Sequence, residues 1–309
     1  FLLLSPVTIA FTFHDPLAVG RKEVIFFLFY NLYLLYFLEK LNLSVYKFLF
    51  FFFVGISFTL IHEIFIFFTT FFLFSKYFYA KISNIKLNLN LFSNELILIA
   101  GSLMSVLALI FFSSHNPELK NLVCSRLIEN GLNQEICTGA LSEIVFSKYL
   151  NSYKSFGLID YIIDNNYIFV YLLSTLLFFI PLFFFLSSII YTSKEIKLFL
   201  YFIIFQLILI SSIFVVVNDW GRYLNTYFIY ILIFISYFFL EKIKLQKAKY
   251  NKLIIIILIL YFSTWHMPHC CQTNIGNGFF NFKHRIIYRI NNPSNYEDKT
   301  RDLINKLIR

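Results

Sequence analysis

Long apolar runs recur along this chain and are separated by short polar segments. About 20 apolar residues let an α-helix cross the hydrocarbon core of a bilayer, because each helical residue rises about 1.5 Å. The pattern predicts seven full membrane spans, preceded by a truncated helix that ends at Phe13. The seven spans cover residues 24–38, 48–74, 96–112, 167–190, 197–217, 223–240 and 252–265.

The composition agrees with this pattern, since 59% of the residues are hydrophobic and 14% are charged. Ordinary soluble domains carry about 25% charged residues. We therefore expect an all-α fold, a polytopic transmembrane helical bundle that forms a single integral membrane domain over residues 1–309. The chain begins with Phe1 rather than Met, so we expect the natural protein to extend further at its N-terminus.

Lysine and arginine predict the orientation of the bundle, because cytoplasmic connections are enriched in both residues. One set of connections is basic and is assigned to the cytoplasm; the short connections of the other set hold only Lys40, Lys47 and Arg222. The formal charge of +9 is thus interpreted as a topology signal, and no nucleic-acid partner is expected. The basic set comprises Arg21, Lys22, Lys76, Lys81, Lys86, Lys194, Lys197, Lys242, Lys244, Lys247, Lys249 and Lys252.

The opposite, extracytoplasmic face is expected to hold a cap loop at residues 113–166 and a C-terminal tail at residues 266–309. Within the cap loop, Asn116 and Pro117 suit the start of a helix and Gly131 suits its end. A small helical cap over the mouth of the bundle is the preferred interpretation, and an inert surface loop is the alternative. The tail ends in a mixed-charge segment with the spacing of a short amphipathic helix.

All four cysteines fall on this predicted outer face, where an oxidising compartment favours disulfides. Cys124 with Cys137 is one pairing, and bonds from the cap to the segment after the last span are the other. A zinc site that adds His266 and His269 is less favoured, because two adjacent cysteines fit tetrahedral geometry poorly. We therefore expect no metal site. The disulfide candidates are Cys124, Cys137, Cys270 and Cys271.

The pair His62 and Glu63 interrupts the apolar run at residues 48–74. An ionisable side chain at membrane depth costs about 2.5–3.5 kcal/mol on insertion scales, so such a group usually faces a protein interior or a watery cavity. A catalytic role predicts that one residue acts as a base while the other orients it. The alternative is a structural hydrogen bond between helices.

A second polar cluster, Asn218–Asn225, joins two spans at the predicted outer face. Asp219 and Arg222 are three residues apart and can pair, and Gly221 permits a tight turn. A structural ion pair in a turn is one interpretation. The other makes Arg222 a fork for phosphate or carboxylate at the membrane surface.

Two further polar segments carry weaker signals. His266 and His269 flank Pro268 where the last span ends, and both are candidates for substrate binding at the outer face. The segment at residues 14–23 is interpreted as a cytoplasmic turn with an orientation signal. Nucleotide-binding glycine motifs and the G-x-S-x-G motif are absent from the sequence, so we expect no ATP and no cofactor.

The span with His62 and Glu63, the long outer loop and the string D-W-G-R-Y resemble bacterial multispanning envelope proteins of the surface-polysaccharide polymerase and lipid-linked glycosyltransferase type. The resemblance implies a helical bundle that acts on polyprenyl-diphosphate-linked sugars at the outer leaflet. It implies that Arg222 holds the diphosphate and that Glu63 or His62 deprotonates the acceptor hydroxyl. The chain departs from the metal-dependent members, which carry acidic motifs in their first outer loop.

The preferred hypothesis is a multi-pass protein of the bacterial inner membrane that transfers or polymerises lipid-linked sugars, with the catalytic residues Glu63, His62 and Asp219 and the binding residues Arg222, His266 and His269. The bilayer and a polyprenyl-linked glycan are its expected partners. A proton-linked transporter or channel that uses His62 and Glu63 is the first alternative. A membrane scaffold whose outer cap recruits partners is the second.

Overall fold

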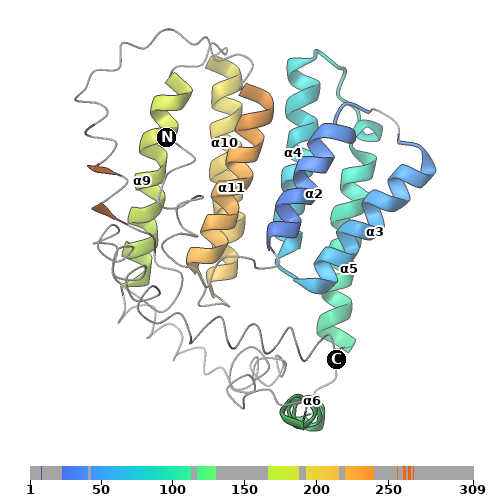
Figure 1. Ribbon diagram of the computed structural model, residues 1–309. Helices are drawn as coiled ribbons and strands as arrows, with labels where there is room; N and C mark the ends of the chain where they lie inside the picture. The colour runs from blue at the N-terminus through green and yellow to red at the C-terminus, as the bar shows by residue number, and fades with distance from the viewer. Residues whose placement is uncertain are drawn as a thin grey trace. The chain divides into compact units, whose positions relative to one another are not determined.

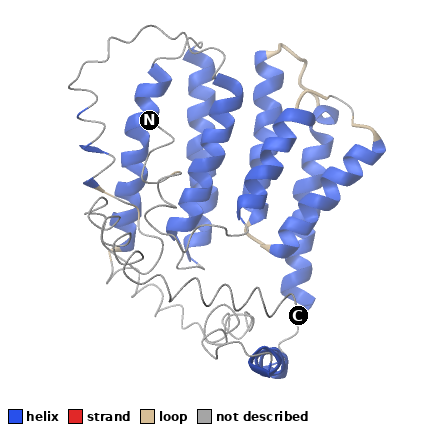
Figure 2. Cartoon of the chain, in the orientation of Figure 1, coloured by secondary structure: helices blue, strands red, loops and turns tan. Residues whose placement is uncertain are grey.

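In a computed structural model of the chain, the regular elements that the structure describes are helices (Figures 1 and 2). They are α2 (Glu23–Tyr36), α3 (Val45–Ile61), α4 (Phe65–Ile82), η3 (Leu89–Phe92), α5 (Ser93–Phe112), α6 (Pro117–Glu129), α9 (Tyr167–Ser187), α10 (Ser193–Ser211), η6 (Ser212–Val215) and α11 (Trp220–Phe239). The described residues are 8, 23–40, 43–112, 117–129, 166–187, 193–215, 220–239, 256, 260–261, 264–265 and 267.

The chain divides into two compact units. The first comprises Phe1–Leu107 and Ile163–Phe279, and the second comprises Ala108–Ile162 and Phe280–Arg309. The second unit contains α6, which begins at Pro117 and ends at Glu129. The helix that the sequence predicts between Asn116 and Gly131 is therefore confirmed, while its position as an extracytoplasmic cap stays a prediction.

By length and composition, four of the described helices are suited to cross a bilayer. They are Phe65–Ile82, Leu89–Leu109, Lys194–Phe214 and Trp220–Phe239. Three further apolar helices are shorter, at Glu23–Tyr36, Val45–Ile61 and Tyr167–Phe183. The all-α prediction and the membrane prediction are thus supported; the count of seven full spans stays a prediction, because the run at residues 252–265 lies largely outside the described residues.

The predicted single span at residues 48–74 is wrong, because the structure divides that run into α3 and α4. His62 has an extended backbone, with φ −156° and ψ 104°, and α4 begins at Phe65. A continuous helix from Val45 to Ile82 would be about 57 Å long at 1.5 Å per residue, almost twice the roughly 30 Å of a bilayer core. The polar pair therefore marks a turn between two helices rather than the middle of one.

This extra turn also corrects the predicted alternation of sides. The sequence pattern places the start of the span at residues 24–38 on the same side as Lys76. In the structure Glu23 lies beside His62, at the beginning of α4, whereas Lys76 lies nearer the other end of α4 and contacts Leu38 and Lys40. Lys40 therefore lies at the same end as Lys76, Lys81 and Lys86, which we call the lysine-rich end, and Glu23 lies at the opposite end. Arg21 and Lys22, which the pattern assigns to the side of Lys76, directly precede Glu23 in the sequence and lie outside the described residues.

Aromatic side chains from α2, α4, α10 and α11 fill the interface between these four helices. Tyr30 of α2 stacks on Tyr230 of α11 with ring centroids 4.7 Å apart, and Phe74 of α4 stacks on Phe202 of α10 at 3.4 Å. Tyr227 of α11 donates a hydrogen bond to the main chain of α10. Figure 1 shows α2 beside α4 and α10 beside α11. These contacts hold the beginnings of α2, α4 and α11 at one end.

Small residues allow α3 and α5 to approach closely. A Cβ atom on Gly101 of α5 would lie 2.6 Å from the ring of Phe52, and one on Gly55 of α3 would collide with Leu98. Thr59 donates a hydrogen bond of 3.0 Å to Ser102 across the same interface. Small residues and hydroxyl bonds at a helix crossing are typical of membrane bundles, where lipid provides no hydrophobic force between helices.

The outward faces of the helices are apolar, as contact with lipid requires. Large side chains exposed to the surroundings occur on α2, α5, α9 and α10. Examples are Leu28, Leu35, Leu103, Met104, Phe169, Leu176, Tyr201 and Ile208.

Gly101→Leu is predicted to force α5 away from α3, because the new side chain would occupy the space of the Phe52 ring. Overpacking of this kind costs about 1–3 kcal/mol, which should appear as a lower thermal unfolding temperature in detergent. The matched control is Ala100→Leu, since Ala100 is the adjacent, exposed residue of α5. Equal unfolding temperatures for the two variants would contradict the close crossing.

Candidate functional site

Three helices bring an acid, an imidazole and a guanidinium together at one end of the first unit. Glu23 is the first residue of α2, His62 follows the end of α3, and Arg222 is the third residue of α11. One carboxylate oxygen, Oε1 of Glu23, lies 3.0 Å from Nε of Arg222 and 3.4 Å from Nε2 of His62. We refer to Glu23, His62, Glu63 and Arg222 as the Glu23 cluster.

The Glu23 cluster has a buried part and a more open part. The side chains of His62 and Glu23 are 5% and 8% exposed, whereas that of Glu63 is 49% exposed. Oε2 of Glu63 lies 3.6 Å from Nδ1 of His62. The imidazole therefore lies between two carboxylates, one buried and one half-exposed, and its two nitrogens give it the means to pass a proton between them.

Tyr223 holds the guanidinium of Arg222 on its other side. Nη2 of Arg222 donates a hydrogen bond of 2.6 Å to the Tyr223 hydroxyl, and the guanidinium carbon lies 4.8 Å from the centre of the Tyr223 ring. Thr226 donates a hydrogen bond to the backbone carbonyl of Arg222. Arg222 is thus oriented by an acid, a phenol and its own helix, which leaves it little rotamer freedom to lose when an anion binds.

Aromatic rings form the floor beneath the imidazole. The ring of Phe26 lies 6.1 Å from that of His62, and Phe26 packs on Phe58 and Phe65. The Tyr223 ring meets His62 edge-on at 6.3 Å. An apolar floor lowers the local dielectric constant, so the charges of the Glu23 cluster interact more strongly than they would in water.

The helix directions add a positive field at this end. α2, α4 and α11 begin here (Figure 1), and the N-terminus of a helix carries about half a positive charge from its aligned peptide dipoles. Glu23, in the first turn of α2, offsets part of this field. Arg222 and the helix ends together favour a second anion near the cluster.

Three of the residues proposed from the sequence, His62, Glu63 and Arg222, come together in the structure. Asp219, His266 and His269 lie outside the described residues, as do Cys137, Cys270 and Cys271. Cys124 is buried on α6 and is disulfide-bonded. Among the described residues, no group of three or more His, Cys, Asp and Glu side chains has an arrangement that suits a metal ion.

Sequence reasoning misses Glu23, the residue on which the cluster converges. The available signal is an acid at the first position of an apolar helix, a position that the helix dipole favours. The sequence pattern assigns Glu23 to a cytoplasmic turn, because it gives no sign of the break at His62. A second group of buried polar residues is missed as well: Tyr33, Lys76 and Glu95, which come from α2, α4 and α5.

Comparisons with known protein families, curated proteins and solved structures found no match to this chain.

Glu23→Gln is predicted to lower the stability of the folded chain by about 3 kcal/mol, because it leaves a mostly buried guanidinium without its acid. Unfolding in detergent measures the effect. The control is Glu63→Gln, which removes a half-exposed acid and should cost less than about 1 kcal/mol. The double variant Glu23→Gln/Arg222→Gln should lose less unfolding free energy than the two single variants lose together, because the two residues interact. Strict additivity would argue against the ion pair.

Proposed function

We propose that this chain is a multi-pass membrane protein of bacterial envelope glycan assembly that transfers or polymerises sugars linked to polyprenyl diphosphate. One observation carries the proposal: a mostly buried guanidinium and a buried imidazole share the Glu23 carboxylate beside the half-exposed Glu63. This arrangement supplies an anion-binding group and a proton acceptor in one place. It also lies at the ends of helices, where a lipid-linked diphosphate would meet the bilayer surface.

In the proposed reaction, Glu63 takes the proton of the acceptor sugar hydroxyl. The freed oxygen forms a bond to the anomeric carbon of the donor sugar, and the bond from that carbon to the diphosphate oxygen breaks. The diphosphate leaves with the electron pair, and Arg222 stabilises its charge. His62, between Glu63 and Glu23, orients Glu63 and can receive the proton from it.

Two features support an extracytoplasmic position for the Glu23 cluster. Exposed lysines gather at the opposite end, as the positive-inside rule predicts for the cytoplasmic face. Cys124, in the helix that follows α5, is disulfide-bonded, and disulfides are typical of oxidising compartments. The lysines are Lys40, Lys47, Lys81, Lys86, Lys194 and Lys197.

The aromatic core favours this proposal over a proton-linked transporter. A transport path would need polar groups between the Glu23 cluster and the lysine-rich end. In the described part of the bundle, aromatic rings occupy much of that interval: Phe26 packs on Phe65, Phe65 on Phe72, and Phe72 on Tyr33. Polar side chains in the interval are paired with one another, Tyr30 with Ser75 and Gln206 with Thr70. Proton exchange at the Glu23 cluster therefore favours a reaction at that end of the bundle over the passage of protons through it.

Glu63→Gln is predicted to abolish proton acceptance while keeping the size and the hydrogen bonding of the side chain. General-base catalysis contributes about 100-fold or more, so glycan formation should fall by about that factor in cells with normal amounts of the protein. Glycan chain length on gels and transfer from a polyprenyl-diphosphate donor measure the loss. The control is Glu39→Gln, an exposed acid beyond the other end of α2. Unchanged glycan in the Glu63 variant would reject the proposal.

A further inference from the structure

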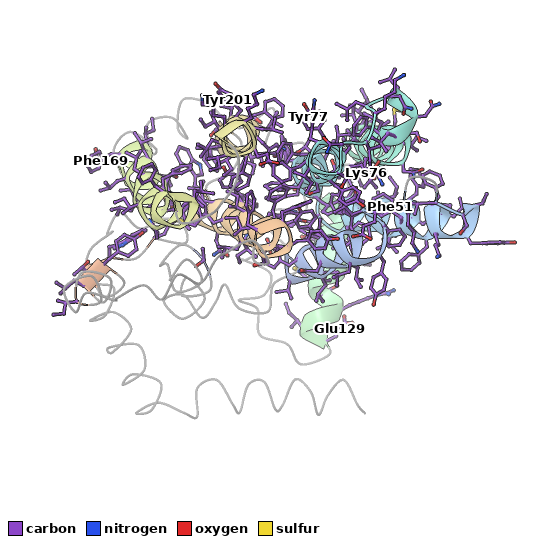
Figure 3. The ribbon with its side chains drawn as sticks, turned by 90° about the horizontal axis from the view of Figure 1, so that it is seen from above. Phe51, Lys76, Tyr77, Glu129, Phe169 and Tyr201 are labelled. Atoms are coloured by element: carbon purple, nitrogen blue, oxygen red, sulfur yellow. The ribbon has the colours of Figure 1, made fainter. Side chains whose placement is uncertain are left out.

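Lys76 is buried inside the bundle, although lysine ordinarily lies at the surface. It belongs to α4 and is 2% exposed, while its neighbour Tyr77 is half-buried; Figure 3 labels both residues. Its ammonium donates two hydrogen bonds of 2.6 Å, one to the backbone carbonyl of Leu38 and one to that of Lys40. The charge is therefore held by carbonyl oxygens rather than by water.

These carbonyls are available because α2 has just ended. The N–H groups of Phe37 and Leu38 both bond to the carbonyl of Tyr33, and the chain then turns away from the helix. The last carbonyls of a helix have no partner in the helix itself and form its negative pole. The segment just after α2 thus presents the carbonyl oxygens of Leu38 and Lys40 near the negative pole of the helix, where a cation is favoured.

Glu95 supplies a buried carboxylate whose charge acts on Lys76, although the two side chains form no direct salt bridge. It lies in the first turn of α5, is 2% exposed, and its Oε1 accepts a hydrogen bond of 2.7 Å from the Tyr33 hydroxyl. Its Oε2 is buried and accepts no hydrogen bond from the residues that the structure describes. Glu95 and Lys76 interact electrostatically. A buried carboxylate oxygen without a hydrogen-bond donor is costly unless a cation lies nearby.

We propose that Leu38 O, Lys40 O and Glu95 form a site for a monovalent cation, which the chain fills with the ammonium of its own Lys76. Backbone carbonyls that replace the hydration shell of an ion are the means by which proteins bind potassium. Here the cation is tethered covalently to α4. It fastens the connection after α2 to α4 and α5 without dependence on the surrounding salt.

The proposal predicts that removing the tether leaves a site that a free cation can enter. Lys76→Ala keeps Cβ and deletes three carbons and the amine, which propylammonium replaces. In choline chloride, the thermal unfolding temperature of the Lys76→Ala variant in detergent should be lower than that of the parent chain. Propylammonium or potassium chloride at the same ionic strength should restore at least half of the loss, with saturation. Choline is the reference because it is bulky and has no N–H donor.

Three further variants separate a cation site from a simple hydrogen-bonded cap. Lys76→Met fills the space without charge and should gain nothing from either salt. Lys81→Ala removes an exposed lysine of the same helix, which lies over the Tyr77 ring, and should show no difference between salts. In the double variant Lys76→Ala/Glu95→Gln, the salt concentration that gives half of the rescue should be at least tenfold higher. An unchanged rescue would remove the carboxylate from the proposed site.

The responses of Lys76→Ala to the three salts decide between the cation site and a simple cap. If Lys76→Ala unfolds at the same temperature in choline, potassium and propylammonium, Lys76 is a cap and the cation site is rejected. If the variant folds only when it is prepared with propylammonium and unfolds on exchange into choline, the site is supported. Failure to fold in every salt would also count against it.

Discussion

The arrangement of this bundle depends on one carboxylate. Arg222 and His62 both contact the same carboxylate oxygen of Glu23. The three residues lie at the ends of three helices that are far apart in the sequence. Removing either partner would leave a buried charge, which is strongly destabilising. The contact therefore fixes the beginning of α11 and the turn before α4 against α2, and it places the half-exposed Glu63 beside them.

The two ends of the helices carry complementary charge. At one end, where α2, α4 and α11 begin, the dipoles favour anions, and Glu23 occupies part of that field. At the other end, the negative pole of α2 favours cations, and Lys76 donates hydrogen bonds to the carbonyls of Leu38 and Lys40, just after α2 ends at Tyr36. The first end keeps a half-exposed acid, Glu63, whereas at the second the ammonium of Lys76 is buried. Aromatic rings of the core separate the two.

The helical class is predictable from the sequence because apolar runs of span length are rare outside membrane helices. The helices at residues 93–112, 193–211 and 220–239 follow directly from that pattern. The break at His62 is not predictable in this way, because neither glycine nor proline marks it and apolar residues continue on both sides. The pairing of Glu23 depends on that break, so it is missed as well.

The burial of Lys76 has no signature in the sequence either. A lysine near the end of an apolar run ordinarily signals topology. Its position depends instead on the carbonyls of Leu38 and Lys40, which follow α2 and lie 38 and 36 residues away in the sequence, a tertiary relation without a local pattern. Conversely, Arg222 and His62 are recognisable as candidates because isolated polar groups among apolar residues are costly and therefore conspicuous.

Residues 62–64 form a turn between two helices rather than the middle of one, and we propose that this turn lies at the outer face of the membrane. Introducing Glu63→Cys and, separately, Lys81→Cys, followed by treatment of intact cells with an impermeant thiol reagent, tests it directly, with the parent chain as the blank. We expect the cysteine at position 63 to be labelled in intact cells and the one at position 81 to be labelled only after the cytosol is opened. The reverse order, or no labelling at position 63 in either condition, would contradict it.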